Sequence, residues 1–355
     1  MELSDKTRIN AGAGYDVLIG RELLASSGEF IRAAMGQRKC MIVSETNVAP
    51  LYLQTVKESC ESAGLSVSCY VFPAGEERKN LTTFGQILEA LAAAHLTRKD
   101  FVIALGGGVC GDIAGFAAGC YMRGIPFVQI PTTVLSMVDS SVGGKCAVDL
   151  PQGKNLAGVF HQPSLGLCDI DTLSTLPPEV FSDGCAEAVK TGILTGGELT
   201  ELLNGDAGAA DLARIISLCI AYKGGVVERD EKELGERKLL NLGHTAAHAI
   251  EKCSGYRVSH GRAVAIGTAM IARASDRLGW SREPVAPVAE AMLRRFDLPL
   301  ETDFTPEQLL EAALSDKKRS GNQTTIVVPE AVGRCVLRDV DDAQLLEVFN
   351  AGWRL

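Results

Sequence analysis

The feature that most constrains the fold is an alternation of apolar strands and amphipathic helices between Lys39 and Pro131. Short apolar runs bounded by polar, Gly or Pro residues predict buried strands, whereas apolar residues at helical spacing predict helices. Strands that alternate with helices form mostly parallel sheets, which bind ligands at the carboxyl ends of their strands. The predicted strands are residues 40–47, 65–72, 101–105 and 125–131, and the predicted helices are residues 50–63, 81–94 and 112–121.

The sequence changes in character after about Asp171. The segment LSTLPPEVFSDG (173–184) predicts turns, and a nearly all-apolar segment at 263–279 predicts a fully buried helix. Further helices are predicted at 185–194, 211–227 and 244–253, and a small hairpin at 324–340. We therefore expect an α/β N-terminal domain (1–175) with a mostly parallel, Rossmann-like sheet. A mainly α-helical C-terminal domain (176–355) follows, with the active site in the cleft between the two.

Composition excludes several function classes. The net charge of −9 argues against a surface that coats nucleic acid, and 5% aromatic residues offer few platforms for base stacking. No apolar run approaches the 18 or so residues of a membrane span, and the segment MELSDKTRIN has no apolar core of a signal peptide. Eleven scattered cysteines without a CxxC motif predict buried thiols in a reducing, cytoplasmic compartment.

A glycine-rich turn follows the predicted strand 101–105. The residues Gly106 to Asp112 read GGGVCGD and contain the pattern GxGxxG, in which glycines let the backbone approach a pyrophosphate. The alternative is a tight turn from strand to helix without a ligand. The pattern follows the third predicted strand rather than the first, and no phosphate-binding GxxxxGK[ST] motif surrounds Lys145.

The next segment, residues 131–155, is polar and punctuated by glycines, so we predict a long irregular loop. Asp139, Lys145, Lys154 and Asn155 lie in it and are candidates to converge on an anion. The alternative is a solvated loop with ordinary lysines.

Three of the five histidines fall within 17 residues, at His244, His248 and His260. His244 and His248 are four residues apart and share a helix face, but Thr245 stands where the HExxH motif has its glutamate. Two histidines with a carboxylate such as Glu187 make an open catalytic zinc site, whereas structural histidines are the alternative. Taken alone, Glu187 and Lys190 indicate a surface ion pair. Likewise, residues 229–244 indicate a solvated charged turn, in which Arg237 and Asn241 share the face of His244.

Taken in order, these segments resemble the sugar phosphate cyclases, and among them most closely the 3-dehydroquinate synthases of the shikimate pathway. The matching motifs run from about Gly75 to Gly267. They are GGGVCGD, YMRG, PTTVLSMVDSSVGGK, GKN, AEAVKTG, DEKELGERKLLNLGHTAAHAIE and SHGRAVAIG.

The resemblance implies a role for each matching residue. Spacing suggests His244 and His248 as the metal-binding pair. The resemblance instead implies that three residues bind zinc (or cobalt): Glu187, His244 and His260. Glu233 and His248 match the positions of proton transfer, and one of Lys317 and Lys318 is a further candidate for the substrate. The implied substrate-binding residues are Arg123, Asp139, Lys145, Asn155, Lys190, Lys223, Arg237, Asn241 and His248. The implied NAD contacts are Glu45, Asn47, Glu76, Lys79, Gly107, Gly108, Val109, Gly111, Asp112, Thr132, Thr133, Lys145, Lys154, Thr172 and Thr175.

Three positions depart from the family pattern. Arg262 stands where an acidic residue often follows the HG pair, Cys110 lies inside the glycine turn, and Glu45 replaces the usual aspartate. A glutamate can still bond a ribose hydroxyl, so we expect NAD to be used.

The implied activity is a phosphate-eliminating cyclisation by a homodimeric lyase. Its substrate, 3-deoxy-D-arabino-heptulosonate 7-phosphate, becomes 3-dehydroquinate plus phosphate. The steps are transient oxidation by NAD, elimination, re-reduction and an intramolecular aldol reaction. The alternatives are another sugar phosphate cyclase and a metal-dependent polyol dehydrogenase, while a binding module without activity is a more remote one. The fixed cations argue against a neutral polyol, because a substrate with a carboxylate and a phosphate needs them.

Overall fold

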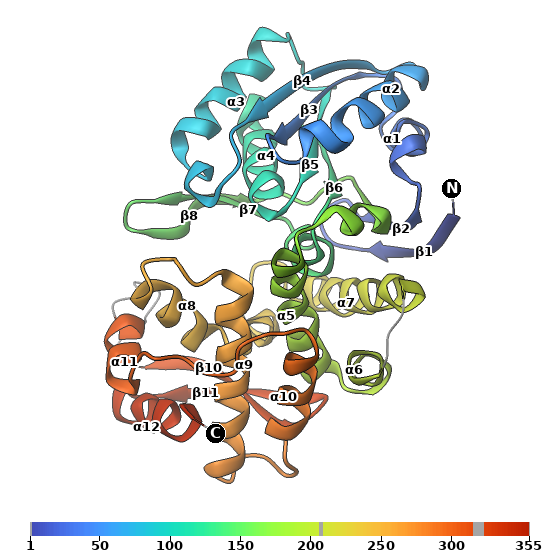
Figure 1. Cartoon of the computed structure of the whole chain (residues 1–355). Helices are drawn as coiled ribbons and strands as arrows, with labels where there is room; N and C mark the ends of the chain where they lie inside the picture. The colour runs from blue at the N-terminus through green and yellow to red at the C-terminus, as the bar shows by residue number, and fades with distance from the viewer. Residues whose placement is uncertain (1, 206–208, 315–322, 355) are drawn as a thin grey trace. The chain divides into compact units, whose positions relative to one another are not determined.

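The computed structural model describes residues 2–205, 209–314 and 323–354 and shows two compact units (Figure 1). The N-terminal unit comprises Met1–Leu176 and Lys223–Glu231, and the C-terminal unit comprises Pro177–Tyr222 and Lys232–Leu355. The segment Lys223–Glu231 contains the last residues of the long helix α7 (Ala209–Arg229). Lys317 and Lys318 lie outside the described residues.

A seven-stranded sheet forms the centre of the N-terminal unit. All of its neighbouring strands are parallel except the first pair, which is antiparallel, so the predicted mostly parallel sheet is confirmed. Across the sheet the strands are β1 (Glu2–Ile9), β2 (Tyr15–Arg21), β9 (Leu165–Asp169), β6 (Phe127–Pro131), β5 (Phe101–Gly106), β3 (Lys39–Glu45) and β4 (Ser66–Phe72).

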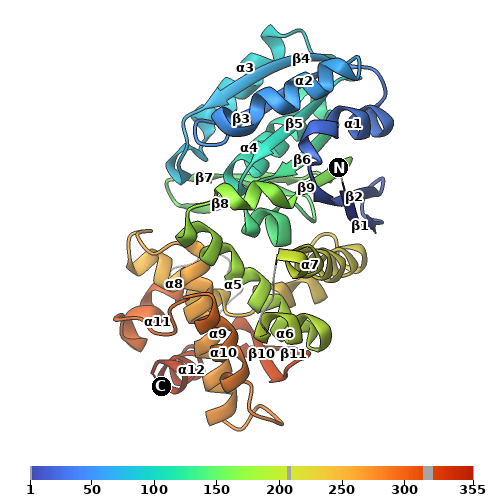
Figure 2. The same cartoon turned by 45° about the vertical axis from the view of Figure 1, so that its right-hand side comes forward.

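Helices cover both faces of this sheet, as Figures 1 and 2 show. Successive residues of a strand point to opposite faces, so Ile42 of β3 packs with α1 and α2 while Val43 packs with α3 and α4. A strand buried on both faces must be apolar along its whole length, which explains the continuous apolar runs in the sequence. The helices are α1 (Ser27–Met35), α2 (Gln54–Ser62), α3 (Leu81–Ala93) and α4 (Gly108–Cys120).

Two predictions for this unit were wrong. The segment 131–155 is not one irregular loop, because β7 (Lys145–Leu150) and β8 (Gly153–Phe160) form an antiparallel hairpin around a turn at Pro151 and Gln152. Helix α4 begins at Gly108 rather than at Asp112, so the glycine-rich segment is the first turn of the helix. Short helical turns complete the unit: η1 (Leu24–Ser26), η2 (Ala49–Leu53), η3 (Glu76–Arg78), η4 (Tyr121–Arg123), η5 (Ser136–Ser140) and η6 (Ile170–Thr175).

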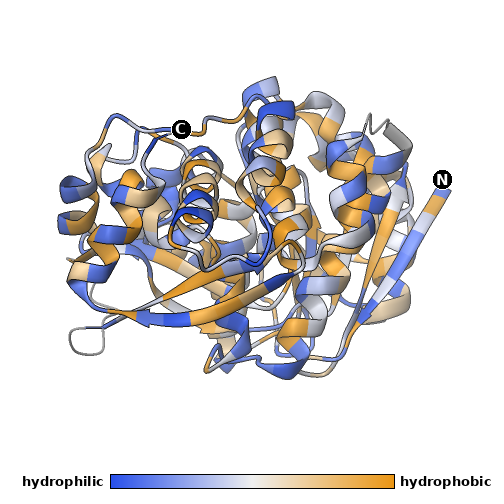
Figure 3. Cartoon of the chain, turned by 90° about the horizontal axis from the view of Figure 1, so that it is seen from below, coloured by the Kyte–Doolittle hydropathy of each residue, from blue (hydrophilic) through white to orange (hydrophobic). Residues whose placement is uncertain are grey.

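The C-terminal unit is mainly helical, as predicted. Its central helix α9 packs against α5, α8 and α12, and most of its residues are buried. Figure 3 shows many helices with hydrophobic residues along one side and hydrophilic residues along the other. The helices are α5 (Pro178–Thr195), α6 (Gly197–Asn204), α7, η7 (Glu236–Asn241), α8 (His244–Cys253), α9 (His260–Arg277), α10 (Ala286–Arg295), α11 (Pro306–Leu314) and α12 (Asp342–Gly352).

The smaller predictions for this unit had mixed outcomes. The hairpin is confirmed as β10 (Thr324–Ala331) paired with β11 (Arg334–Val340). The predicted turns at 173–184 were wrong in part, because α5 already begins at Pro178, a residue whose fixed φ suits the first position of a helix.

Two further expectations concerned buried thiols and membrane spans. All eleven cysteines are free thiols, and seven of them are buried, as expected for small apolar side chains. Within the described residues, no helix has the length and apolarity needed to cross a membrane.

Candidate functional site

Three helices of the C-terminal unit bring one carboxylate and two imidazoles together. Glu187 lies in the middle of α5, while His244 and His260 are the first residues of α8 and α9. Oε1 of Glu187 lies 3.1 Å from Nε2 of His260 and 3.6 Å from Nε2 of His244. One ligand atom from each residue lies within 4.8 Å of the others.

These donors fit a zinc ion. Bonds of about 2.0–2.1 Å in a tetrahedral site place neighbouring ligand atoms about 3.4 Å apart, close to the separations observed here. Two imidazoles and one carboxylate also leave the fourth position open, which is typical of catalytic rather than structural zinc. The cluster therefore has the chemistry and the geometry to hold a divalent ion that a substrate oxygen can reach.

Neighbouring groups hold both rings in place. Nδ1 of His244 lies 3.1 Å from the carbonyl oxygen of Leu242, and Nδ1 of His260 lies 3.6 Å from Oε1 of the buried Glu251. A metal-binding histidine commonly uses its second nitrogen in this way, which fixes the tautomer and the ring orientation. Sequence reasoning missed Glu251, although it lies seven residues after His244, on the same face of α8.

The protonation states follow from these contacts. Burial raises the pKa of Glu187, but Lys190 and the two histidines outweigh burial and hold this pKa well below its usual value. Burial, with Lys190 nearby, lowers the pKa of His244 to about 3. Burial also lowers the pKa of His260, but its contacts with Glu187 and Glu251 prevail and raise the pKa to about 10. A metal ion that binds here displaces the proton of His260.

Lys190 lies one helical turn after Glu187, and its Nζ lies 2.5 Å from Oε2 of that residue. The surface ion pair indicated by these two residues alone was wrong, because both are almost fully buried. A buried charge requires a partner, so each holds the other in its charged form. Lys190 is therefore part of the support of the cluster.

Four other predicted residues lie near this cluster in sequence. The exposed ring of His248 lies at right angles to that of His244, with 5.5 Å between the ring centroids. Nδ2 of Asn241 donates to Oε1 of Glu233 at 2.9 Å, and the backbone of Glu233 has a left-handed φ of +60°. Arg237 is 1% exposed, so the predicted solvated turn was wrong at this position.

Close helix contacts make the cluster possible. A Cβ atom on Gly261, next to His260, would lie 1.8 Å from the carbonyl oxygen of Asp183 in α5. Oδ1 of Asp183 also accepts a hydrogen bond from the backbone N–H of Arg262 at 2.9 Å, which anchors the first turn of α9. The exposed Arg262 takes part in this contact only through its backbone, so its departure from the family pattern leaves the anchor of α9 intact.

The N-terminal unit holds a second polar cluster around the buried Lys79. Its Nζ donates to Oδ2 of Asp112 at 2.5 Å and to Oδ1 of Asn155 at 2.6 Å. In the same region, Nζ of Lys154 lies 3.6 Å from Oε1 of Glu76. The structure thus joins five predicted residues, which come from η3 and the residue after it, the first turns of α4 and the β7–β8 hairpin.

The other predicted cofactor residues follow the carboxyl ends of adjacent parallel strands, where such sheets bind ligands. Glu45 ends β3, Gly107 and the residues after it follow β5, Thr132 and Thr133 follow β6, and Thr172 and Thr175 follow β9. Glu45 accepts backbone N–H groups of Asn47 and Val48 at 2.7 and 3.1 Å. Tyr52 hydrogen-bonds Thr175 Oγ1 at 2.5 Å and the carbonyl oxygen of Thr172 at 3.2 Å.

The remaining predicted substrate residues of the N-terminal unit are spread over several elements. Lys223 forms an ion pair with the Asp139 carboxylate and donates to its carbonyl oxygen at 2.7 Å. Arg123 is exposed in a turn with a φ of +71°, and Lys145 is exposed at the start of β7.

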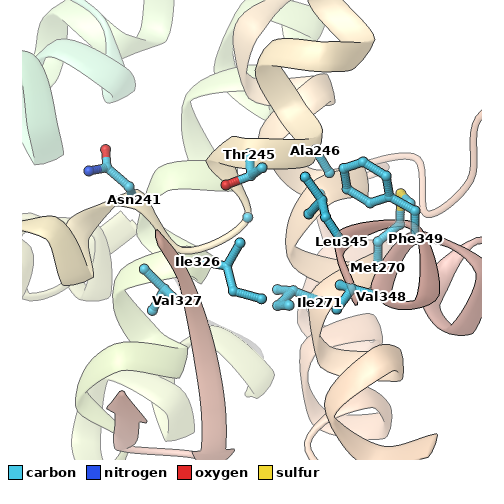
Figure 4. Close-up of a pocket in the computed structure, with 12 residues that line it drawn as sticks. Asn241, Thr245, Ala246, Met270, Ile271, Ile326, Val327, Leu345, Val348 and Phe349 are labelled. Carbon is cyan, nitrogen blue, oxygen red and sulfur yellow. The ribbon is translucent and has the colours of Figure 1, made fainter. Parts of the chain in front are cut away.

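A small cavity of about 20 Å³ lies in the C-terminal unit close to His244. Figure 4 shows apolar side chains that include Met270, Ile326 and Phe349 gathered around it, with Asn241 at its edge. None of its lining residues is charged. Because the sugar phosphate implied by the resemblance needs fixed cations, this cavity does not have the chemistry expected of its binding site.

Comparison with known proteins gives consistent matches over the chain. The family model for the 3-dehydroquinate synthase N-terminal region matches residues 69–183, and that for the C-terminal region matches residues 184–319. A 3-dehydroquinate synthase from Paracoccus denitrificans is 42% identical over 96% of this chain and 97% of its own length.

Two solved structures have a similar fold. A 2-deoxy-scyllo-inosose synthase, complexed with carbaglucose-6-phosphate, NAD+ and Co2+, is 26% identical with a TM-score of 0.87, covering 98% of this chain and 100% of that chain. A 2-epi-5-epi-valiolone synthase from Streptomyces hygroscopicus subsp. jinggangensis, with NAD+ and Zn2+ bound, is 27% identical with a TM-score of 0.85, covering 95% of each chain. Both halves of the sequence match one family, and the chain belongs to the 3-dehydroquinate synthase family.

Proposed function

We propose that the protein converts 3-deoxy-D-arabino-heptulosonate 7-phosphate into 3-dehydroquinate and phosphate, the activity in the name of its relatives. The observation that carries the proposal is the group of Glu187, His244 and His260, in a chain that matches the family over both halves. This reaction would place the enzyme in the shikimate pathway, which supplies aromatic amino acids.

We propose that Glu187, His244 and His260 hold one Zn²⁺ or Co²⁺ ion and that the residues at the strand ends hold NAD. When bound, NAD supplies a reversible hydride acceptor and the metal ion supplies Lewis-acid polarisation of a substrate oxygen. Lys79 and Lys154 carry the positive charge that an anionic pyrophosphate requires, and Asp112 and Glu76 hold these two lysines in place.

The proposed substrate carries a carboxylate and a phosphate, so it needs cations in fixed positions. We assign this role to the side chains of Arg123, Lys145, Lys190, Lys223 and Arg237, with Asp139, Asn155 and Asn241 as hydrogen-bonding partners. The buried ion pair of Lys190 and the partly buried ion pair of Lys223 keep these two ammonium groups oriented before the substrate arrives.

Proton transfer falls to His248 and Glu233. The exposed His248 ring is accessible to a ligand, and imidazole exchanges protons near neutral pH. The amide of Asn241 holds the Glu233 carboxylate, which accepts a proton only while it is ionised.

The direct test incubates the purified protein with the heptulosonate phosphate, NAD and Zn²⁺. We expect phosphate and 3-dehydroquinate to form together while NADH does not accumulate, because the hydride returns to the substrate. Stoichiometric NADH would instead indicate a dehydrogenase. The matched control is the double variant His244→Ala/His260→Ala under the same conditions.

A second candidate is another sugar phosphate cyclase, because the two similar solved structures are cyclases with other products. The same assay with a heptulose 7-phosphate and a hexose 6-phosphate separates the candidates. The higher identity to the 3-dehydroquinate synthase, 42% against 26–27%, favours the first one.

We also propose that the enzyme is a cytoplasmic homodimer. Free thiols at all eleven cysteines suit a reducing compartment. Sedimentation at micromolar concentration is expected to give about twice the chain mass of 37.7 kDa, and a monomer would contradict the dimer.

A further inference from the structure

The β7–β8 hairpin contains an irregularity close to the Lys79 cluster. Val148 pairs with Ala157 and Leu150 pairs with Gly153, so three residues of β8 lie opposite the single residue Asp149. The extra residues form a bulge, and Asn155 within it has a left-handed φ of +55°. Asparagine tolerates this conformation better than most residues, but the backbone N–H at this position needs a new partner.

Asp149 supplies that partner. Its Oδ1 accepts a hydrogen bond from the backbone N–H of Asn155 at 2.7 Å. Its own backbone N–H donates to the carbonyl oxygen of Lys79 at 2.8 Å, and it forms an isolated parallel bridge with Asn80. One residue thus connects the bulge to the segment that carries Glu76 and Lys79.

The side chains joined by this connection are those of the proposed cofactor site. Asn155 turns its Oδ1 to Lys79 Nζ at 2.6 Å, and Lys154, one residue earlier in the bulge, lies 3.6 Å from Glu76. The carboxylate of Asp149 is half-buried, and burial raises its pKa although the Asn155 N–H and Lys79 oppose this. A half-buried carboxylate stabilises the structure through the hydrogen bond that it accepts, here from the Asn155 N–H.

We propose that Asp149 is a positioning residue for NAD binding. Its carboxylate fixes the bulge of β8, so that Lys154 and Asn155 face Glu76 and Lys79 before the cofactor binds. The proposal rests on the proposed NAD-binding role of Lys79 and Lys154. Asp149 acts through these side chains and needs no contact of its own with the cofactor.

The test measures the dissociation constant of NAD by calorimetric titration, together with the melting temperature. Asp149→Ala removes the acceptor, whereas Asp149→Asn keeps an oxygen that can accept the same N–H. We expect Asp149→Ala to weaken NAD binding about tenfold, as for the loss of a hydrogen bond to a charged group. Asp149→Asn is expected to bind NAD nearly as well as the unaltered chain. The control is Asp339→Ala, which removes a carboxylate of β11 that accepts a hydrogen bond from Thr325 of β10. This variant is expected to leave the dissociation constant of NAD unchanged.

Three results would overturn the proposal. The affinity of Asp149→Ala for NAD could equal that of the unaltered chain. Its melting temperature could fall while its affinity for NAD stays the same, which indicates a purely structural role. Both variants could bind NAD more tightly, which means that the carboxylate acts by repelling the pyrophosphate. If Asp149→Ala does not fold, Asp149→Ser replaces it, because its shorter side chain falls short of the Asn155 N–H. Absence of NAD binding by the unaltered chain would instead refute the proposed cofactor site, and with it this inference.

Discussion

Among the described residues, each unit of the protein contains a deeply buried lysine paired with a carboxylate. Lys190 lies 2.5 Å from Glu187 in the C-terminal unit, and Lys79 lies 2.5 Å from Asp112 in the N-terminal unit. The pairs differ in what surrounds them. The carboxylate of Glu187 faces two imidazole nitrogens, whereas the ammonium of Lys79 faces the oxygen of Asn155 as a second acceptor.

This difference explains why similar ion pairs suit opposite ligands. In the C-terminal unit the lysine neutralises one carboxylate oxygen, and the other oxygen joins two nitrogens in a set of donors for a cation. In the N-terminal unit the carboxylate secures the lysine at the end of a parallel sheet, where a helix N-terminus also favours an anion. In the proposed assignment, the ligand therefore depends on the groups around the pair rather than on the pair itself.

The largest effect is expected when two of the proposed metal ligands of the C-terminal unit are removed and the N-terminal unit is left unchanged. The double variant His244→Ala/His260→Ala is expected to lose its metal ion and at least about 10³-fold in turnover, because Lewis-acid catalysis contributes several kcal/mol. Zinc content measured by mass spectrometry and turnover of the heptulosonate phosphate check this.

NAD binding serves as the control for this variant. The residues of the N-terminal unit are unchanged, so the dissociation constant for NAD is expected to stay the same. Full metal occupancy in the double variant would refute the proposed ligand set.

A second prediction compares the two ion pairs directly. In metal-free protein, Glu187→Gln is expected to lower the free energy of unfolding by about 3–5 kcal/mol, because it leaves a buried ammonium without its counter-charge. Asp112→Asn is expected to lower it less, because Lys79 keeps its bond to Asn155 and Asp112 is less buried than Glu187. Urea denaturation in the presence of a chelator measures both variants.

The control is the exposed pair of Glu198 with Arg214. Glu198→Gln is expected to leave the unfolding curve unchanged, since solvent screens exposed charges. Equal losses for Glu187→Gln and Asp112→Asn would contradict the assigned difference between the pairs.

The sequence predicted the sheet and most helices because hydrophobic spacing is a local signal. The strand β5, for example, is apolar at all but its last residue and buried along its whole length. The β7–β8 hairpin was missed because both strands are half-exposed and β8 is interrupted by glycine, so the alternation along the hairpin is weak. The residues Pro151, Gln152 and Gly153 between two short runs were the available signal for a turn.

The candidate site was predictable only in part. The helical spacing of His244 and His248 indicated a pair of ligands, whereas the structure groups His244 with Glu187 and His260. Local spacing carries no information about a residue on another helix. His260 joins His244 only through the packing of α9 against α8, and the resemblance to the family supplied it. The burial of Glu187 and Lys190 could not be predicted for the same reason, because a charged pair at i and i+3 has the same spacing on a surface and in a core.

A third prediction concerns the histidine that the structure leaves outside the donor set. His248→Ala is expected to keep its metal ion and its melting temperature, because the ring is exposed, while turnover falls about 10²-fold for a lost acid–base group. Zinc content, thermal unfolding and turnover on this one variant distinguish the roles. Loss of zinc would make His248 a ligand, and unchanged turnover would exclude proton transfer. His95→Asn, at an exposed histidine in the N-terminal unit, is the control and should be neutral.

The smallest expected effect belongs to Glu251, which acts on the metal ion through His260. Its Oε1 lies 3.6 Å from Nδ1 of that ring, and its side chain is 3% exposed, so it orients the imidazole whose other nitrogen faces Glu187. Loss of such a partner lowers metal affinity by about 10–100-fold. We expect Glu251→Gln to lie near the lower end of this range, because an amide can still accept a hydrogen bond, and Glu251→Ala near the upper end. Competition with a chelator measures the affinity, and thermal unfolding of the metal-free protein shows that each variant is folded. Equal zinc affinity in both variants and the unaltered chain would mean that the helix contacts of α9 alone hold His260 in place.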